Sequence, residues 1–307
     1  MINKHEFKAM GCHMLAALEL PIENQSNQLE QVPSWFEAWE QSLSRFRETS
    51  ELSQLNHSTG TPLKVSETFW DVLMVALESE RLSFGLVTPA VLDVLITAGY
   101  DRSFDQLPPA SSYLMMDRLV PVGLLSEIHL DEPNRTVCLP PDMRLDFGGV
   151  AKGWAADQAT CKLAAFGPAM VNAGGDIAAS GPQSNGEAWP IGITDPFNPE
   201  ANLEILMIKQ GGVATSGKDY RRWQRDGIWQ HHIIDPLIGM PAQTDVLTAT
   251  VIAPSAVEAE VAAKVALISG SEAGLDWIES NPALAGMLVL EDGQRIYSQR
   301  ISEYLWS

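Results

Sequence analysis

In the stretch GGVATSGKDY, four residues separate Gly212 from the pair Gly217-Lys218, which is the spacing of a phosphate-binding P-loop. A P-loop also needs a Ser or Thr directly after the lysine, to hold magnesium, and a helix after the loop. Here Asp219 follows Lys218, and the next residues, YRRWQRDG, are typical of a strand and a turn. The stretch therefore argues against a nucleoside triphosphatase, although its glycines allow a close approach of the backbone.

Three further clusters combine glycine or proline with side chains that could do chemistry: DFGGVAKG, NAGGD and HHIIDPLIG. Each is weak alone, because a Gly-Gly pair usually makes only a turn and a histidine in a strand is usually structural. Alternation along one extended strand predicts that Gln230, His232 and Ile234 share a face, with His231 and Asp235 on the other. The two histidines are therefore not expected to act together.

Taken in order, a larger set of motifs resembles the ApbE family of flavin transferases over about residues 7 to 297: KAMGC, SLSRFRETSELSQLN, LDFGGVAKGWAAD, VNAGGDIAASG, VATSG, HHIIDPLIGMP and TVIAPSAVEAEVAAKVALISG. The resemblance implies an FAD:protein FMN transferase, in which a Ser or Thr hydroxyl of a target protein attacks the diphosphate of FAD. FMN then stays on the target as a phosphoester and AMP departs. FAD as substrate, a magnesium ion and a flavin-acceptor protein as partner are implied with it.

The resemblance also assigns roles to single residues. His232 falls at the proposed general base. The positions assigned to FAD contacts are Met10, Phe46, Leu86, Val87, Thr88, Asp146, Lys152 and Ile234. Lys152 opens a helix, so that its ammonium and the helix N-terminus could both bind phosphate. In this context Thr215 and Ser216 of the opening stretch become expected hydroxyl or amide donors to FAD.

At the metal ligands the chain departs from the family, which uses a backbone carbonyl, at Gly149 here, with an Asp and a Thr four residues apart on the last helix. Glu260 and Lys264 stand in those two places. Glu can bind magnesium, but a protonated lysine has no lone pair to offer. Two interpretations stay open: a surface i,i+4 ion pair beside a lost metal site, or a Lys264 ammonium that replaces part of the ion's charge. At 100° per residue Lys264 lies at the edge of the apolar stripe, which comprises Val257, Val261, Val265 and Ile268.

The pattern along the chain predicts an α+β fold with largely antiparallel sheets and flanking helices. Helices are expected at 34–46, 66–83, 86–99 (opened by Pro89), from Lys152 through Ala165, and at 255–270, with capping boxes at Ser34/Glu37 and Ser255/Glu258. Hairpins are expected around Asp226-Gly227 and Asp292-Gly293. No linker interrupts residues 1–307, which predicts a single ApbE-like domain with tightly associated subdomains.

Charge and composition exclude some classes of function. The chain carries 39 acidic and 20 basic residues, a net charge of −19, which disfavours nucleic acid and anionic membranes as partners. Its three scattered cysteines predict neither a zinc site nor a disulfide framework. The N-terminal stretch is typical of a strand rather than a signal peptide, and no window is apolar enough to span a membrane. A cytoplasmic protein is predicted.

Because the metal positions differ from the family, two alternatives stay open: a non-catalytic flavin- or FAD-binding protein, and an FAD pyrophosphatase.

Overall fold

A computed structural model describes residues 1–20, 27–107, 110–111, 122–225 and 227–306. The chain divides into two compact units. Unit 1 comprises Met1–Glu37, Lys152–Gly217 and Thr244–Ser307, and unit 2 comprises Ala38–Ala151 and Lys218–Gln243. Helix α1 (Gln28–Leu43) begins in the first and ends in the second.

Unit 1 is built on an eight-stranded sheet in which every neighbouring pair is antiparallel. The strand order is β1-β2-β7-β8-β11-β16-β17-β18. The strands are β1 (Ile2–Ala9), β2 (Cys12–Glu19), β7 (Ala169–Ala173), β8 (Asp176–Ala179), β11 (Gly211–Gly217), β16 (Val246–Ala253), β17 (Ala285–Leu290) and β18 (Arg295–Tyr297). The N-terminal stretch is thus a strand of this sheet, as predicted.

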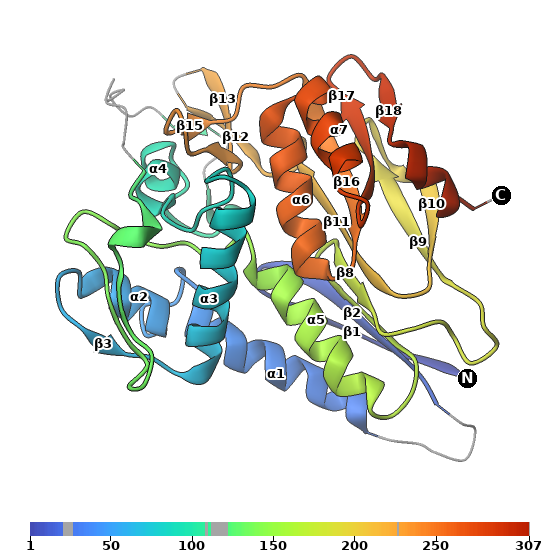
Figure 1. Ribbon diagram of the computed structural model, residues 1–307, viewed down its shortest axis with the longest axis horizontal. Coiled ribbons are helices and arrows are strands. Elements are labelled where there is room, and N and C mark those ends of the chain that lie inside the picture. Colours follow the sequence, from blue (N-terminus) through green and yellow to red (C-terminus); the bar gives the residue numbers. More distant parts are fainter. Residues whose placement is uncertain (21–26, 108–109, 112–121, 226, 307) are drawn as a thin grey trace. The chain divides into compact units, whose positions relative to one another are not determined.

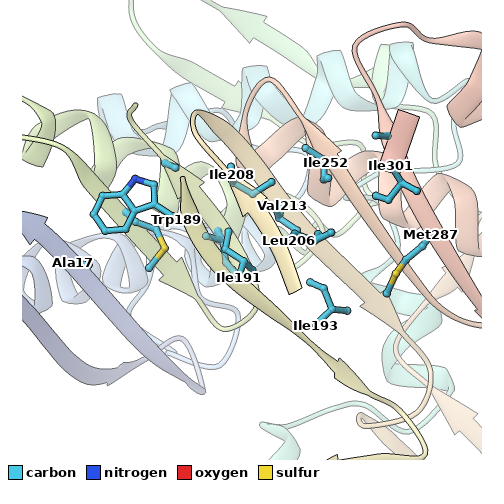
Figure 2. Close-up of a cluster of buried hydrophobic side chains, with 14 residues drawn as sticks. Ala17, Trp189, Ile191, Ile193, Leu206, Ile208, Val213, Ile252, Met287 and Ile301 are labelled. Atoms are coloured by element: carbon cyan, nitrogen blue, oxygen red, sulfur yellow. The ribbon is translucent and has the colours of Figure 1, made fainter. Parts of the chain in front are cut away.

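The two faces of this sheet are covered differently. Helices α5 (Ala151–Ala164) and α6 (Ala256–Ser269) lie side by side across one face, and α7 (Ser271–Ser280) follows α6. On the other face packs the hairpin of β9 (Trp189–Asp195) and β10 (Asn198–Ile208). Trp189, Ile191 and Leu206 of this hairpin meet Val213 and Ile252 of the sheet in a buried apolar core (Figure 2). A short 3-10 helix, η3 (Gln299–Glu303), packs beside it.

Unit 2 is made of short helices and small sheets. Its α-helices are α2 (Glu51–His57), α3 (Glu67–Leu82) and α4 (Leu92–Thr97), and its 3-10 helices are η1 (Phe104–Gln106) and η2 (Leu125–Glu127). One three-stranded sheet has the order β3-β6-β5, with β3 (Leu63–Lys64), β5 (His129–Asp131) and β6 (Thr136–Cys138). A second has the order β13-β12-β4, with β4 (Ala110–Ser111), β12 (Arg222–Arg225) and β13 (Ile228–His231), followed by the pair β14 (Ile234–Asp235) and β15 (Met240–Pro241). Only the β4–β12 pair is parallel among the described strand pairs, so the predicted α+β fold with largely antiparallel sheets is confirmed.

Several predicted boundaries are confirmed because the local chemistry dictates them. The Ser255 hydroxyl accepts the Glu258 N–H at 3.2 Å and starts α6, which ends at Gly270 with a φ of 83°. The Ser66 hydroxyl caps α3 in the same way. Strands β12 and β13 form the predicted hairpin, although Asp226 of its turn lies outside the described residues.

Two predicted helices are wrong at their starts. Ser34 is not an N-cap, because α1 already begins at Gln28 and the Ser34 hydroxyl donates to the Gln31 carbonyl inside the helix. The helix predicted over 86–99 is reduced to α4, and Pro89 lies before it. The Pro89 carbonyl accepts the Asp146 N–H at 2.8 Å, so this segment is held by another part of unit 2 rather than by helical bonds.

Two strand predictions also need correction, and two of the described α-helices, α2 and α7, were not predicted. The ATSG motif, whose glycine-rich surroundings are typical of a turn, lies instead in β11, where β16 pairs with all four of its residues. The strand expected through Ile234 stops at His231 and resumes at Ile234, so the predicted alternation of side chains does not hold across His232. Helix α7 follows α6 after only Gly270, without a side-chain cap that could have revealed it.

Candidate functional site

In unit 1, four charged side chains from three elements form a buried charge cluster, defined here as Lys152, Asp176, Glu260 and Lys264. Lys152 belongs to the first turn of α5, Asp176 opens β8, and Glu260 and Lys264 are one turn apart on α6. Lys152 Nζ lies 3.1 Å and Lys264 Nζ 3.0 Å from the same carboxylate oxygen, Glu260 Oε1. Lys152 Nζ also contacts Asp176 Oδ2 directly. The ion pair predicted between Glu260 and Lys264 therefore exists, but it is not a surface pair.

The backbone brings these side chains together. Asp176 and Ala178 point to the same side of β8, and Ala178 is paired with Gly212 in β11. A Cβ at Gly212 would lie 2.2 Å from the Ala256 nitrogen, which shows that this side of the sheet faces α6. At the other end of the carboxylate, the Gly153 N–H donates to Glu260 Oε2 at 2.9 Å and ties α5 to α6.

The ionisation of the cluster follows from burial and from these contacts. Burial alone would raise the pKa of Glu260, but Lys152, Lys264 and the Gly153 amide outweigh it and lower this pKa to about 2. For Asp176, burial and the repulsion of Glu260 outweigh the lysines and raise the pKa to about 6. Burial would lower the pKa of Lys152, but Asp176 and Glu260 together raise it above its ordinary value. At neutral pH the cluster therefore holds two ammonium groups and two carboxylates.

These residues do not fit a magnesium site. Magnesium takes six oxygen ligands at about 2.0–2.1 Å, whereas both ammonium groups already lie against the Glu260 carboxylate. A protonated lysine cannot ligate a metal, and a divalent ion on Glu260 Oε1 would be repelled by two cations. Across the part of the chain that the structure describes, no group of three or more His, Cys, Asp or Glu side chains could hold a metal ion. Gly149, the other predicted ligand, lies in the turn before α5.

Met10 and the pair Thr215 and Ser216 occupy other places in unit 1. Met10, with a φ of 49°, and Gly11 form the tight turn between β1 and β2. The next residue, Cys12, lies where a side chain on Gly174 would be, and Lys152 borders the same spot. Thr215 and Ser216 point to opposite faces of β11 because side chains alternate along a strand. The Thr215 hydroxyl bonds to the Thr250 hydroxyl at 2.9 Å, while Ser216 lies on the face that Gly212 presents to α6.

In unit 2, hydrogen bonds and an ion pair fix the position of Asp146. The buried Asn56 side chain makes two hydrogen bonds to the backbone of the preceding Leu145, at 2.7 and 2.8 Å. Asp146 Oδ1 accepts the Gly148 N–H at 2.8 Å, which closes the glycine turn, and Asp146 Oδ2 lies 2.6 Å from Arg45 Nε. The carboxylate is thus fixed at the end of the segment that leads to α5.

Arg45 links Asp146 to an aromatic group that includes a second predicted residue. Its guanidinium lies 4.1 Å from the centre of the Phe46 ring and 4.6 Å from that of Tyr100, as cation–π contacts. Tyr100 in turn packs against Trp223, and both belong to the apolar cluster that contains Ile234. The structure therefore brings Phe46, Asp146 and Ile234 into one continuous network within unit 2.

The other predicted residues of unit 2 lie in two places. Leu86, Val87 and Thr88 follow α3, where the Thr88 hydroxyl donates to Glu80 Oε2 at 2.8 Å and Val87 N donates to the Ser83 hydroxyl at 2.9 Å. His232 is half-buried between β13 and β14. Its neighbour His231 contacts the Ala242 carbonyl through Nε2 at 3.1 Å.

Three charged residues of these networks were not predicted as site residues: Arg45, Glu80 and Asp176. Asp176 carries a signal that could have been used, because an acidic residue that opens a strand of buried residues needs a cation. Arg45 lies inside the motif SLSRFRETSELSQLN, but neither its spacing nor that of Glu80 indicates which residue it contacts.

Known proteins resemble this chain over most of its length. The model of the ApbE family matches residues 10–288. An FAD:protein FMN transferase of Vibrio cholerae is 30% identical over 83% of this chain and 78% of its own length, and one of Treponema pallidum is 29% identical over 86% and 77%. The ApbE protein of Thermotoga maritima superposes with a TM-score of 0.87 at 25% identity, covering all of both chains. The fold is shared with the flavin transferase ApbE from Vibrio cholerae, with a TM-score of 0.81 over 99% of both chains. The family resemblance predicted from the motifs is confirmed, and the chain belongs to the ApbE family.

Proposed function

We propose that this protein is an FAD:protein FMN transferase that transfers FMN to a Ser or Thr hydroxyl of an acceptor protein. The observation that carries the proposal is the family match over residues 10–288, together with curated relatives of that activity at 25–30% identity. Lys152 and Asp146 support it as residue types, because both stand at positions that the motifs assign to FAD contacts.

In the proposed reaction, the acceptor hydroxyl oxygen attacks the phosphorus on the FMN side of the FAD diphosphate. The bond from this phosphorus to the bridging oxygen breaks, AMP leaves with that oxygen, and the hydroxyl proton passes to a base. Lysine ammonium groups bind the diphosphate oxygens, and His232 accepts the proton. Magnesium stays a prediction from the sequence, and because Glu260 already binds three donors, no step of this scheme uses a metal.

Further predictions from the sequence are part of the proposal. Met10, Phe46, Leu86, Val87, Thr88, Ile234, Thr215 and Ser216 are the other residues that we assign to FAD. Residues 1–307 are proposed to act as one ApbE-like domain. No helix among the described residues is long and apolar enough to cross a membrane, and we propose that the protein acts in the cytoplasm, which fractionation of cells expressing it would test.

The activity is tested with FAD and a flavin-acceptor domain whose target residue is a threonine. We expect the acceptor to gain the mass of FMN less one water, with one AMP released per acceptor. The acceptor with its target Thr→Ala serves as control and should gain nothing. Release of AMP and FMN without labelling of the acceptor would identify an FAD pyrophosphatase instead, and FAD binding without either product would identify a binding protein.

The role of His232 is tested by His232→Ala, with His231→Ala as the matched control. Removal of a general base costs about 10²–10⁴-fold in rate, so transfer should fall by that factor while FAD still binds. His231 contacts a main-chain carbonyl, and its loss should affect folding more than turnover. Unchanged turnover in His232→Ala would remove this residue as the base.

A further inference from the structure

The buried charge cluster of unit 1 is charge-balanced, but its cations and anions are not equally exposed. The side chains of Asp176 and Glu260 are 3% and 1% exposed, whereas those of Lys152 and Lys264 are 18% and 15% exposed. The carboxylates therefore lie underneath, and the parts of the cluster that reach solvent belong to the two lysines. An anion that approaches this surface meets the cations first.

Lys264 has a fixed position in this arrangement. Its ammonium donates to Glu260 Oε1 at 3.0 Å, and that oxygen is held in place by Lys152 and, through the other carboxylate oxygen, by the Gly153 amide. An ammonium carries three N–H donors, and this bond occupies one. A metal ion that bound Glu260 would have to displace an ammonium, which would then stay partly buried beside a divalent cation, at a high electrostatic cost.

We propose that the Lys264 ammonium, anchored by Glu260, takes the place of a divalent cation and binds the diphosphate directly, so that this chain binds diphosphate compounds without magnesium. The nature of the anion, the diphosphate of FAD, rests on the proposed function. The site itself rests on the donor set: two carboxylates that hold two ammonium groups, with no open position for a metal. These ammonium groups resemble a bound metal ion in one respect: buried carboxylates hold them in place, and their positive charge faces the ligand.

The proposal is tested by the affinity for ADP, measured by titration calorimetry in a chelator and again with magnesium chloride. ADP carries the diphosphate but cannot be cleaved to FMN, so that binding is measured apart from transfer. We expect the wild-type dissociation constant to change by less than about threefold between the two conditions. A larger tightening by magnesium, or no ADP binding in the chelator, would overturn the proposal.

Three variants of Lys264 sharpen the test. Lys264→Gln removes the charge and keeps a polar side chain that is one atom shorter, and it should weaken ADP binding by about tenfold or more, because the diphosphate loses a charged hydrogen-bond donor. Lys264→Arg keeps the charge and should retain most of the affinity. Comparison of Lys264→Ala with Lys264→Gln separates the effect of losing the charge from the effect of losing the rest of the side chain. Wild-type affinity in Lys264→Gln would overturn the proposal, and thermal unfolding of each variant shows whether it folds. If Lys264→Gln does not fold, the wild-type comparison alone decides.

Failure of this inference differs from failure of the proposed function. Transfer of FMN that requires magnesium would overturn the inference and leave the transferase intact. Magnesium-independent binding of ADP without FMN transfer would retain the lysine site and reject the transferase.

Discussion

The carboxylate of Glu260 contacts two ammonium groups and is almost entirely buried. It accepts hydrogen bonds from Lys152 and from the Gly153 amide, which join the first turn of α5 to the middle of α6. Its third hydrogen bond comes from Lys264 within α6. Because the two lysines would repel one another without it, this residue stabilises the cluster as well as orienting Lys264. The structural role of Glu260 can therefore be measured separately from binding.

We expect Glu260→Gln to lower the free energy of unfolding by about 3–5 kcal/mol at neutral pH, as is typical when one partner of a buried ion pair is removed. The native pKa of Glu260 is about 2, below the ordinary value of 4.5. The unfolded chain therefore binds the proton first as pH falls, and the contribution of Glu260, complete above about pH 4.5, is lost toward pH 2. Urea unfolding at several pH values should show the difference between wild type and variant shrink in acid.

Glu258→Gln is the matched control, because Glu258 is exposed in the first turn of the same helix. Its effect should stay below about 1 kcal/mol. Equal effects of the two substitutions, or a cost for Glu260→Gln that does not depend on pH, would contradict the ionic role of Glu260.

For single residues, the sequence predicted the position of a side chain on its helix better than it predicted the residues that the side chain contacts. Helical phase placed Lys264 at the edge of the buried face of α6, where the structure has it. The Lys152 and Asp176 contacts could not be predicted, because they join segments 24 and 108 residues apart in the chain. Only the packing of α5, α6 and β8 decides which charges meet.

Among the elements of unit 1, glycines set how closely the helices approach the sheet and each other. A Cβ at Gly212 of β11 would lie 2.2 Å from the Ala256 nitrogen, and a Cβ at Gly153 of α5 would lie 2.7 Å from Val257 Cα. A Cβ at Gly274 of α7 would lie 2.3 Å from the Ala266 carbonyl oxygen. In all three places the obstacle is backbone of α6, which cannot move aside as a side chain could.

Gly212→Ala should therefore destabilise the protein by at least about 1–3 kcal/mol, the usual cost of overpacking, and reduce ADP binding by shifting α6. Gly181→Ala is the control, because a Cβ at Gly181 would meet no atom within 4 Å. Thermal unfolding compares the two. A stable Gly212→Ala variant would show that α6 is packed less tightly on β11 than the structure indicates.

A second element-scale contact is the carboxylate of Asp157 in α5, which accepts the Ala256 and Val257 N–H groups at the start of α6, at 2.9 and 3.0 Å. Burial, more than the repulsion of nearby glutamates, raises the pKa of Asp157 to about 6, although the two amides lower it. Between about pH 4 and pH 6 the native state thus binds more protons than the unfolded state, so that this group makes the protein less stable as pH rises.

Asp157→Asn should remove this pH dependence. The stability advantage of the wild type over the variant should be larger near pH 4 than at pH 7, as followed by denaturant unfolding. Asp276→Asn, which removes an exposed carboxylate of α7, controls for net charge. A difference that grows toward neutral pH would reverse the sign expected for Asp157.

Element boundaries that depend on neighbouring residues were predictable from the sequence. Segments whose structure depends on packing against distant parts of the chain were not. The Ser255 cap and the Gly270 end of α6 depend on neighbouring residues only, as does the turn at Asp292-Gly293. The ATSG segment was misassigned because Gly211 and Gly212 suggest a turn, whereas their missing side chains serve the packing of β11 against β16 and α6.

At the scale of the whole molecule, the ordered motifs predicted the family, and the pattern of helices and hairpins along the chain predicted the α+β class. The composition gives, in addition, the net charge of the chain. With 39 acidic and 20 basic residues, pairing every basic group still leaves 19 carboxylates without a cation. The buried charge cluster contributes nothing to this excess, because its two lysines balance its two acids.

The excess of negative charge predicts that salt stabilises this protein. Unpaired carboxylates repel one another more in the folded than in the unfolded chain, and raising sodium chloride from about 10 mM to about 150 mM shortens the screening length from about 30 Å to about 8 Å. Salt also weakens exposed pairs such as Arg81–Glu78, but such pairs contribute little. We therefore expect the midpoint of thermal unfolding to rise over this range, with sucrose of matched osmolality as the uncharged control. A constant or falling midpoint would mean that attractive surface pairs outweigh the net repulsion.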